Sequence, residues 1–264
     1  MSLRPAWMAS TGPWLHYLVA VFAFVALASD ARADLSDTIE RVKPSVVAVG
    51  TYVKTREPAF AFHGTGFVVG DGTLVATNAH VVPETMDAAR RESLVVVVNP
   101  GRSDAQVRSA EVHSVDKRHD VALVRMTGGR LPALSFHDSP VREGLPVAFT
   151  GFPIGALLGL TPVTHRGTIA AITPIVLPSA SAQQLSKEMI QRIKTGSFLV
   201  FQLDATSYPG NSGSPLFDVD TGAVLGVVNM AFVKTTREAA LSQPSGISFA
   251  IPVQFLRDLL GAVK

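Results

Sequence analysis

Hydrophobic residues at helical spacing precede a long series of strand-like segments. The intervals between Leu35, Ile39 and Val42 follow one face of a helix, and a proline then ends the pattern. Asp37 and Glu40 stand where a capping box would place them. This pattern predicts a short leading helix. After it the spacing changes to alternation or to short apolar runs, which are typical of β-strands.

The strand-like segments form two series, separated internally by Gly- and Pro-containing turns. Helices do not alternate with them, which favours a β-barrel or sandwich over an alternating α/β fold. The first series predicts strands over residues 45–53, 66–69, 74–76, 94–98, 107–115 and 121–126; after a linker at 128–144, the second predicts strands over 147–150, 161–172, 198–203, 215–217, 224–228 and 247–251.

Two sets of six short strands predict an all-β fold of two six-stranded antiparallel β-barrels, closed so that strand edges are hidden. We place an N-terminal barrel at residues 34–135 and a C-terminal barrel at 136–264. A C-terminal helix, expected to pack on the second barrel, is predicted from the apolar positions Phe255, Leu256, Leu259, Leu260 and Val263.

One segment, between Ile175 and Gly196, interrupts the strand pattern. Leu185, Met189 and Ile193 lie at helical spacing there, with basic residues beside them. The segment is therefore predicted to hold a short amphipathic helix in a long loop. Two roles stay open for it: a cap on the second barrel, or a loop that contacts a substrate or partner.

The N-terminal segment differs from the rest of the chain. An apolar run over residues 17–28 is too short to cross a bilayer core, which needs about 20 helical residues. Small residues at Ala31 and Ala33 fit a cleavage site, so residues 1–33 are predicted to be a signal peptide cleaved after Ala33. A periplasmic or secreted protein without stable membrane insertion follows. The alternative is an uncleaved membrane anchor, because weakly apolar residues just upstream extend the run.

Composition excludes several function classes. The 264 residues are 47% hydrophobic and 17% charged, which excludes a disordered chain. The sequence has no cysteine, which excludes disulfide scaffolds, cysteine zinc sites and thiol catalysis. Its 23 basic and 21 acidic residues are scattered, so no nucleic-acid partner is expected. No metal or cofactor is predicted either, since no His-Glu-x-x-His spacing occurs.

Three local patterns each contribute one residue to a candidate nucleophilic site. His80 follows a predicted strand and is a candidate general base, although a lone histidine is more often structural. Asp120 directly precedes an apolar strand, where an acid is commonly a turn residue. Ser212 lies in Pro-Gly-Asn-Ser-Gly-Ser-Pro, whose glycines allow a tight turn that aims N–H groups at one point. The order His, Asp, Ser is one known for the Ser-His-Asp triad.

On these residues the sequence resembles the trypsin-like serine proteases, and within them the high-temperature-requirement (HtrA) group of envelope proteases. The resemblance runs from about Leu35 to the C-terminus. Segments 64–69 and 72–80 resemble the strand pair that leads into the group's catalytic histidine, and 120–123 resembles its aspartate strand. Further similar segments are 151–155, 202–205 and 246–252.

The resemblance implies an exported serine endopeptidase that hydrolyses peptide bonds of polypeptide substrates without a cofactor. Ser212 would be the nucleophile, His80 the general base, and Asp120 the residue that holds the imidazole. The N–H groups of Gly210 and Ser212 would form the oxyanion hole. The other six of the seven histidines are expected to lack an aspartate partner of this kind.

Three departures from the group's pattern limit what carries over. Members commonly have PDZ domains after the protease; none follows in this sequence, so regulation by that route is expected to be absent. Ser214 stands where the group usually has glycine, as in bacterial glutamyl endopeptidases. The loop at 55–63 is short and the insertion at 175–196 is long, so inter-subunit contacts cannot be carried over and homo-oligomer formation stays open.

The resemblance also implies where the primary specificity pocket lies. No residue of that pocket is acidic, whereas cleavage after Lys or Arg needs a buried carboxylate to pair the incoming cation. The nearest acid, Asp204, is expected to face away, and the wall strand offers no histidine for a glutamate. We therefore expect cleavage after small or medium uncharged residues. The pocket is expected to have its floor at Thr206 and Ser207 and its walls at Asn229, Met230, Ala231, Gly246 and Ser248.

Two other function classes stay open. A protease-like fold can hold unfolded polypeptide as a chaperone or scaffold without cutting it, if its oxyanion loop is not ordered. Ester hydrolysis or another acyl transfer would keep the enzyme but change the reaction. The nucleophile elbow of α/β-hydrolases, however, needs alternating strands and helices, and the surroundings of Ser212 are all strand.

Overall fold

The computed structural model describes residues 34–155, 159–174, 198–230 and 246–262. The predicted signal peptide, the predicted helix between Ile175 and Gly196, and Ala231 lie outside the described residues. In the part of the chain that is described, neither helix is long and apolar enough to cross a membrane.

The leading helix is confirmed as α2 (Leu35–Val42), followed by a 3₁₀ turn, η1 (Lys43–Ser45). Its N-cap is Asp34, whose carboxylate accepts a hydrogen bond from the Ser36 N–H at 3.2 Å. The helix therefore begins before the capping box expected at Asp37 and Glu40. Asp37 lies in the first turn instead, where a negative charge favours the helix dipole.

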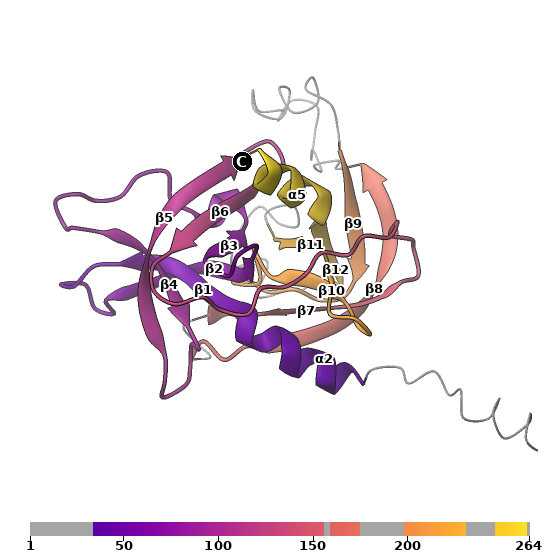
Figure 1. Cartoon of the computed structure of the whole chain (residues 1–264), viewed down its shortest axis with the longest axis horizontal. Helices are drawn as coiled ribbons and strands as arrows, with labels where there is room; N and C mark the ends of the chain where they lie inside the picture. The colour runs from indigo at the N-terminus through magenta and orange to yellow at the C-terminus, as the bar shows by residue number, and fades with distance from the viewer. Residues whose placement is uncertain (1–33, 156–158, 175–197, 231–245, 263–264) are drawn as a thin grey trace, which may run out of the picture. The chain divides into compact units, whose positions relative to one another are not determined.

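As predicted, the first six strands close into an antiparallel barrel (Figure 1), and their order around it is β1-β2-β3-β6-β5-β4. β2 begins at Phe60 rather than Gly66, because its pairing with β1 continues to Phe60 beyond a bulge in which β2 has one extra residue, His63. The strands are β1 (Val46–Tyr52), β2 (Phe60–Val69), β3 (Leu74–Thr77), β4 (Ser93–Val98), β5 (Gln106–Asp116) and β6 (Val121–Met126).

The second six strands also close, in the order β10-β11-β12-β9-β8-β7. The segment that joins the two barrels hydrogen bonds to both, since Leu134 N–H donates to Val68 O and His137 N–H donates to Val224 O, each at 2.9 Å. The strands are β7 (Pro146–Gly151), β8 (Val163–Pro174), β9 (Leu199–Asp204), β10 (Pro215–Asp218), β11 (Val224–Asn229) and β12 (Ile247–Pro252).

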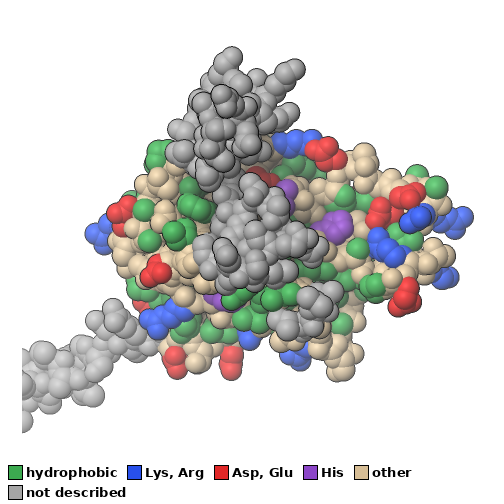
Figure 2. Space-filling view, turned by 180° about the vertical axis from the view of Figure 1, so that it is seen from behind, with side chains coloured by type: hydrophobic (Ala, Val, Ile, Leu, Met, Phe, Trp, Pro, Cys, Tyr) green, Lys and Arg blue, Asp and Glu red, His purple; other side chains and the backbone are tan. Residues whose placement is uncertain are grey.

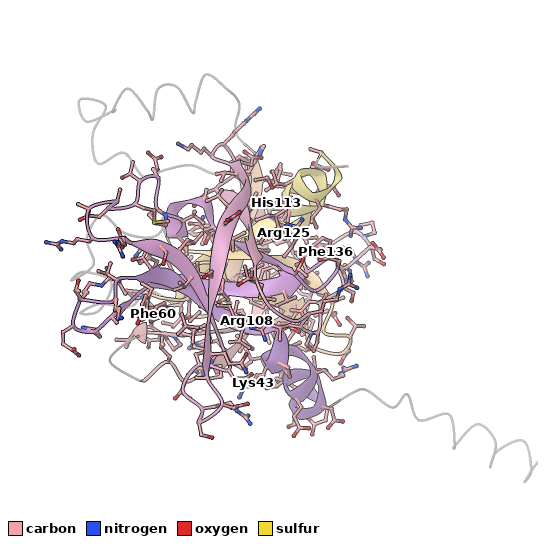
Figure 3. The ribbon with its side chains drawn as sticks, turned by 60° about the vertical axis from the view of Figure 1, so that its left-hand side comes forward. Lys43, Phe60, Arg108, His113, Arg125 and Phe136 are labelled. Atoms are coloured by element: carbon pink, nitrogen blue, oxygen red, sulfur yellow. The ribbon has the colours of Figure 1, made fainter. Side chains whose placement is uncertain are left out.

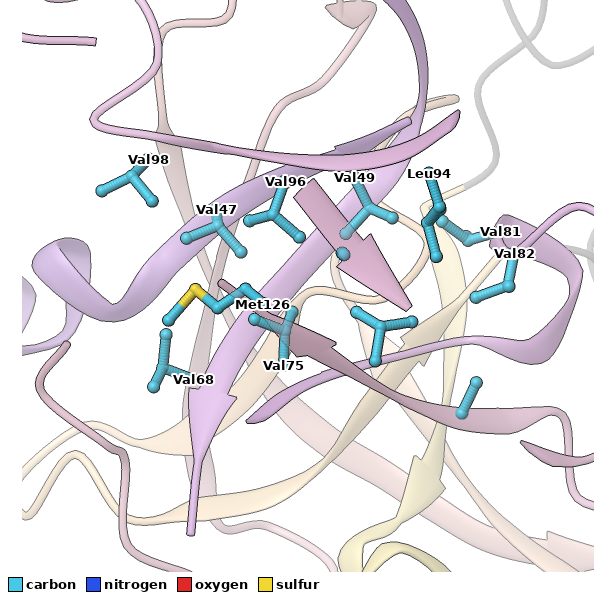
Figure 4. Close-up of a cluster of buried hydrophobic side chains, with 13 residues drawn as sticks. Val47, Val49, Val68, Val75, Val81, Val82, Leu94, Val96, Val98 and Met126 are labelled. Carbon is cyan, nitrogen blue, oxygen red and sulfur yellow. The ribbon is translucent and has the colours of Figure 1, made fainter. Parts of the chain in front are cut away.

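Valine fills the interior of the first barrel (Figure 4). Val47 and Val49 point inward from β1 and are fully buried, as strand alternation requires. Their neighbours Val46 and Ala48 point outward yet are also buried, because they pack against Phe152 and other residues of the second barrel. β1 is therefore apolar on both faces, which explains its continuous hydrophobic run.

The C-terminal helix α5 (Val253–Gly261) packs across the junction of the barrels, above it in Figure 1. The expected packing on the second barrel is present, and the helix contacts the first barrel as well. Leu256 is fully buried in one cluster with Leu123 of the first barrel and Val227 of the second. The helix fastens the two barrels together because one apolar stripe reaches both.

The described outer surface is mixed in charge and includes exposed apolar side chains, among them Val107, Val112 and Val115 of β5. Arg108 and His113 lie along β5, with Arg125 of the paired strand β6 nearby (Figure 3). On the face turned away from Figure 1, acidic and basic side chains are interspersed (Figure 2). Among the residues that the structure describes, no group of three or more His, Asp or Glu is arranged to hold a metal ion.

Candidate active site

His80 is held at a strand end by a short helical turn. β3 ends at Thr77, Asn78 is extended, and the 3₁₀ turn η2 (Ala79–Val81) carries the imidazole. The His80 side chain keeps 38% of its surface exposed. An open groove of about 530 Å³ adjoins it, lined in part by the exposed valines of β5, Val112 and Val115.

Asp120 contacts His80 with both oxygens of its carboxylate. Oδ2 lies 2.7 Å from His80 Nδ1, and Oδ1 accepts a hydrogen bond from the His80 backbone N–H at 2.9 Å. The Asp120 backbone has φ +53°, an uncommon conformation that aspartate tolerates better than most residues. With its proton on Nδ1 shared with the carboxylate, the ring presents Nε2 as the free basic nitrogen.

Asn229 is a site residue whose contact sequence analysis missed. It was predicted as a pocket wall, but its Nδ2 donates to Asp120 Oδ2 at 2.6 Å. Asn78 also donates, from Nδ2 to the Asp120 carbonyl at 3.0 Å. The aspartate is thus fixed from both barrels. A local pattern could not reveal the Asn229 contact, because 109 positions separate the two residues.

Ser212 reaches the same place from the second barrel. Its carbonyl accepts a hydrogen bond from Thr65 N–H at 2.8 Å, and a Cβ built on Gly64 would lie 2.9 Å from that carbonyl and 2.7 Å from Val81, next to His80. Ser212 Oγ accepts a hydrogen bond from Met230 N–H at 3.3 Å. In the described part of the chain, Oγ makes no hydrogen bond to His80. These contacts place Ser212 beside the turn that carries His80, with its hydroxyl hydrogen-bonded to Met230 N–H rather than to the imidazole.

Two N–H groups of the nucleophile loop have no acceptor among the described residues: those of Gly210 and Ser212. Each belongs to a peptide whose carbonyl is already held. Pro209 O accepts from Ile154 N–H at 2.7 Å, and Asn211 O accepts from Ser214 N–H at 3.0 Å. Because the N–H and C=O of a peptide point in opposite directions, the unpaired N–H groups are fixed in orientation and available to a negatively charged oxygen.

Ser214, which departs from the expected glycine, is accommodated by Gly151. Ser214 is fully buried, and a Cβ built on Gly151 would lie 2.0 Å from Ser214 Oγ. Ser214 Oγ has no hydrogen-bond partner among the described residues. The extra hydroxyl therefore occupies space that only a glycine opposite leaves free.

The residues predicted for the specificity pocket are uncharged, and several contact one another. Ser207 is buried, and its hydroxyl contacts the thioether sulfur of Met230. Ser248 Oγ donates to the Ala205 carbonyl at 2.8 Å, so its hydroxyl is occupied. Asp204 is exposed. Thr206 is half-buried and Gly246 is exposed.

A second histidine–aspartate pair lies next to the first. His119 Nδ1 lies 2.5 Å from Asp116 Oδ2, so the expectation that the other histidines lack an aspartate partner is wrong for His119. Partial burial works to raise the pKa of the Asp116 carboxyl, but hydrogen bonds from His119 outweigh it and hold that pKa below its usual value. The His119 ring stacks on Phe255 with centroids 3.9 Å apart.

Curated relatives share most of this chain but are longer than it. It is similar to serine protease HTRA3 of Rattus norvegicus, with 32% identity over 225 residues, which cover 83% of this chain and 42% of that protein. It is similar to the probable periplasmic serine endoprotease DegP-like of Halomonas elongata, with 31% identity over 202 residues, 76% of this chain and 35% of that one. The chain thus spans less than half the length of these relatives.

Known folds and a family model agree with the two-barrel architecture. The active form of the Rv3671c protease from M. tuberculosis superimposes with a TM-score of 0.61 at 23% identity, covering 86% of this chain and 83% of that one. The family model for the trypsin-like peptidase domain matches residues 64–227. That match takes in the predicted histidine, aspartate and serine and more than half of the chain, which belongs to the trypsin-like peptidase family.

Proposed function

We propose that the chain is an exported serine endopeptidase that hydrolyses peptide bonds with Ser212, His80 and Asp120. The observation that carries this proposal is the double contact of the Asp120 carboxylate with His80, beside a loop with two fixed, unpaired N–H groups. An imidazole held in one tautomer and a preformed anion site are the two features that acyl transfer by a serine requires.

In the proposed reaction Ser212 Oγ first turns from Met230 N–H towards His80 Nε2, a rotation between staggered rotamers. Oγ attacks the scissile carbonyl carbon while Nε2 takes its proton. The resulting oxyanion accepts hydrogen bonds from the N–H groups of Gly210 and Ser212. His80 then gives the proton to the leaving amine, and Asp120 stabilises the imidazolium throughout. A water molecule, activated by the same imidazole, releases the acyl group.

We propose that substrates are polypeptides cut after small or medium uncharged residues. The contact between Ser207 and Met230 brings the floor and wall of the predicted pocket together, which supports a narrow, apolar slot. The groove beside His80 supplies apolar surface from Val112 and Val115 for an extended segment. Profiling with a peptide library tests this specificity: dominant cleavage after Lys, Arg or Glu would show that the pocket has been misplaced.

Export is part of the proposal. The relative from Halomonas elongata is named as periplasmic, and residues 1–33 have the pattern of a cleaved signal peptide. N-terminal sequencing of the protein recovered from the periplasm or medium is expected to begin at Asp34. Recovery with the membrane fraction and an intact N-terminus would favour the anchor instead. Self-association is measured on the same sample.

The decisive test of the enzyme is labelling by a fluorophosphonate, followed by digestion and mass spectrometry. We expect the label on Ser212 rather than Ser214, and none in Ser212→Ala or His80→Ala. Peptidase activity is expected to fall by about 10⁴-fold or more in each variant, and the double variant to be little worse, because the triad works as a unit. Ser109→Ala, at an exposed position of β5, is the control and is expected to keep wild-type activity.

A second candidate function is polypeptide binding without cleavage. It is favoured by one observation: Ser212 Oγ accepts a hydrogen bond from Met230 N–H, and among the described residues it makes none to His80. A wild-type protein that resists labelling, cuts nothing and still suppresses aggregation of an unfolded substrate would establish this function. Labelled and active wild-type protein would exclude it as the main activity.

A further inference from the structure

Thr65 links the first barrel to the nucleophile loop of the second. It lies in β2 and is fully buried. Its Oγ1 donates to the Gly210 carbonyl at 2.7 Å, and its N–H donates to the Ser212 carbonyl at 2.8 Å. Oγ1 also accepts a hydrogen bond from Phe152 N–H at 3.1 Å. One residue of the first barrel thus holds three backbone groups of the second.

The carbonyls that Thr65 holds flank the unpaired N–H groups. The peptide that follows Gly210 lies between the two unpaired N–H groups, and the peptide that follows Ser212 comes directly after the second of them. Among the described residues, the Thr65 hydroxyl is the single side chain that hydrogen bonds a carbonyl between residues 209 and 212. Every other partner of those carbonyls is a backbone N–H.

Gly210 makes this side chain important. Its backbone has φ +102°, and a Cβ there would lie 2.3 Å from the Phe152 carbonyl, so only glycine fits. Glycine also imposes the least restriction on rotation of the next peptide. Without the Thr65 hydroxyl, that peptide keeps one hydrogen bond, from Asn211 N–H to Tyr208 O at 3.0 Å. Rotation of the Gly210–Asn211 peptide would then pull on the two adjoining peptides, whose carbonyls are each held by one N–H, of Ile154 and of Ser214, and would turn the N–H groups of Gly210 and Ser212 apart.

We infer that Thr65 is a positioning residue for the oxyanion hole, which it holds in working geometry through the Gly210 carbonyl. The inference rests on the proposed peptidase function and adds to it a residue outside the triad. Thr65 does not touch the substrate. Its hydroxyl keeps the two donors aimed at one point while charge develops on the substrate oxygen.

The expected signature is a loss in kcat with little change in KM. An oxyanion hole acts on the transition state, and ground-state binding does not depend on it. Outright removal of one donor costs about 10²- to 10³-fold in rate. A loosened loop is aligned for part of the time, so for Thr65→Val we expect kcat to fall by about 10- to 100-fold. Thr65→Ser retains the hydroxyl and is expected to stay within about threefold of wild type.

The matched control is Thr38→Val. Thr38 is also fully buried, and its hydroxyl donates to a distant carbonyl, Asp220 O, at 3.3 Å, but it has no contact with the nucleophile loop. For all variants kcat, KM, the rate constant of fluorophosphonate labelling at Ser212 and the thermal midpoint are measured. Thr65→Val and Thr38→Val are expected to unfold at similar temperatures, whereas Thr65→Val alone loses kcat and labelling rate.

Three outcomes would overturn the inference: wild-type kcat in Thr65→Val, equal losses in Thr65→Ser and Thr65→Val, or an equal loss in Thr38→Val. If Thr65→Val shows no cooperative unfolding, the pair Thr65→Ser and Thr65→Ala replaces it, since these differ in one hydroxyl. Wild-type protein that neither cuts nor is labelled would overturn the proposed function and this inference together. Labelled wild-type protein with an indifferent Thr65→Val would overturn this inference alone.

Discussion

Two histidine–aspartate pairs stand side by side in this molecule and differ in what surrounds the ring. His80 and Asp120 are 2.7 Å apart with 38% of the histidine side chain exposed, beside an open groove. His119 and Asp116 are 2.5 Å apart with 16% exposed. The His119 ring stacks on Phe255 of α5 and makes a T-shaped contact with Phe198, with ring centroids 4.9 Å apart.

The carboxylate contacts alone do not distinguish the two histidines, so the general-base role proposed for His80 depends on what surrounds its ring. Both rings have an aspartate at Nδ1, and both aspartates also accept a backbone N–H of the same histidine. His80 lines an open groove, and its turn lies beside the nucleophile loop, whereas Phe255 and Phe198 pack against the ring of His119. His119 instead joins α5 to the turn that precedes Asp120, which is a structural role.

The difference between the two pairs is tested by the same substitution in each, and the largest loss of kcat is expected from Asp120→Asn. The amide would favour the wrong tautomer of His80, and we expect kcat to fall by about 10⁴-fold with the fold intact. Asp116→Asn makes the same chemical change in the other pair. We expect its kcat to stay within about threefold of wild type and its free energy of unfolding to fall by about 1 kcal/mol. Steady-state kinetics and circular dichroism of both variants check this.

If Asp120→Asn unfolds, that aspartate is structural and the assigned roles of the two pairs are wrong. If Asp116→Asn loses activity as severely as Asp120→Asn while it stays folded, the second pair also serves the reaction.

A smaller effect is expected from Phe255→Ala. Loss of a half-buried ring and of its stack on His119 is expected to lower the free energy of unfolding by about 2 kcal/mol, with kcat of the folded protein unchanged. Leu259→Ala is the matched control, because Leu259 is also partly buried on α5. A double-mutant cycle with His119→Ala is expected to give a coupling of about 1 kcal/mol for Phe255 and none for Leu259.

The kcat of Phe255→Ala shows whether the stack of His119 on Phe255 serves the reaction or only the stability of the fold. A fall in kcat of more than about tenfold in folded Phe255→Ala would mean that α5 positions Asp120 through His119. Unchanged kcat with the expected loss of stability would mean that His119 only stabilises the packing of α5 on the turn before Asp120.

Local sequence patterns predicted what depends on neighbours in the chain. The strands around Val96 and Val124 are continuous apolar runs in the sequence, and the structure confirms both strands. Such runs form because the side chains on both faces of these strands are largely buried. Residues 60–65 of β2 were missed: the side chains of 60–63 stay at least partly exposed, and Gly64 and Thr65 form no apolar run, so only the backbone pairing with β1 marks this part as strand. The roles of His80, Asp120 and Ser212 stay predictions that the geometry supports.

Contacts between distant segments could not be predicted. Asn229 reaches Asp120 across 109 positions, and Thr65 reaches Gly210 across 145. Each lies on a strand whose local pattern is ordinary, and only the way the two barrels pack turns it towards the site. The contact of His119 with Asp116 is different, because three positions separate the residues. The signal was local, an aspartate at the end of β5 three residues before a histidine, and it was missed because it lies outside the three catalytic patterns.

The smallest effect is expected from a third histidine, His165, which has no carboxylate partner among the described residues. His165 stacks on Phe149 with centroids 4.9 Å apart, and its Nε2 is buried with no partner among the described residues. Burial lowers the pKa of His165 below its ordinary value of 6.5. Between the lowered pKa and about 6.5 the unfolded chain therefore binds more protons than the folded one. The contribution of His165 to the free energy of unfolding must rise with pH across that window and is reduced by acid.

Chemical unfolding at a series of pH values from about 7 to about 5 measures this contribution. His165→Phe and His165→Gln both remove the titrating group while differing in size and polarity. Both are expected to lose less stability than wild type on acidification, and by the same amount, whatever their stability at neutral pH. Parallel curves for wild type and both variants would mean that the buried ring does not titrate in this range. Curves that differ between Phe and Gln would mean that packing, and not the missing proton, sets the response. Either result would mean that burial of the His165 ring does not make stability depend on pH, so that the three histidines differ only in their carboxylate partners.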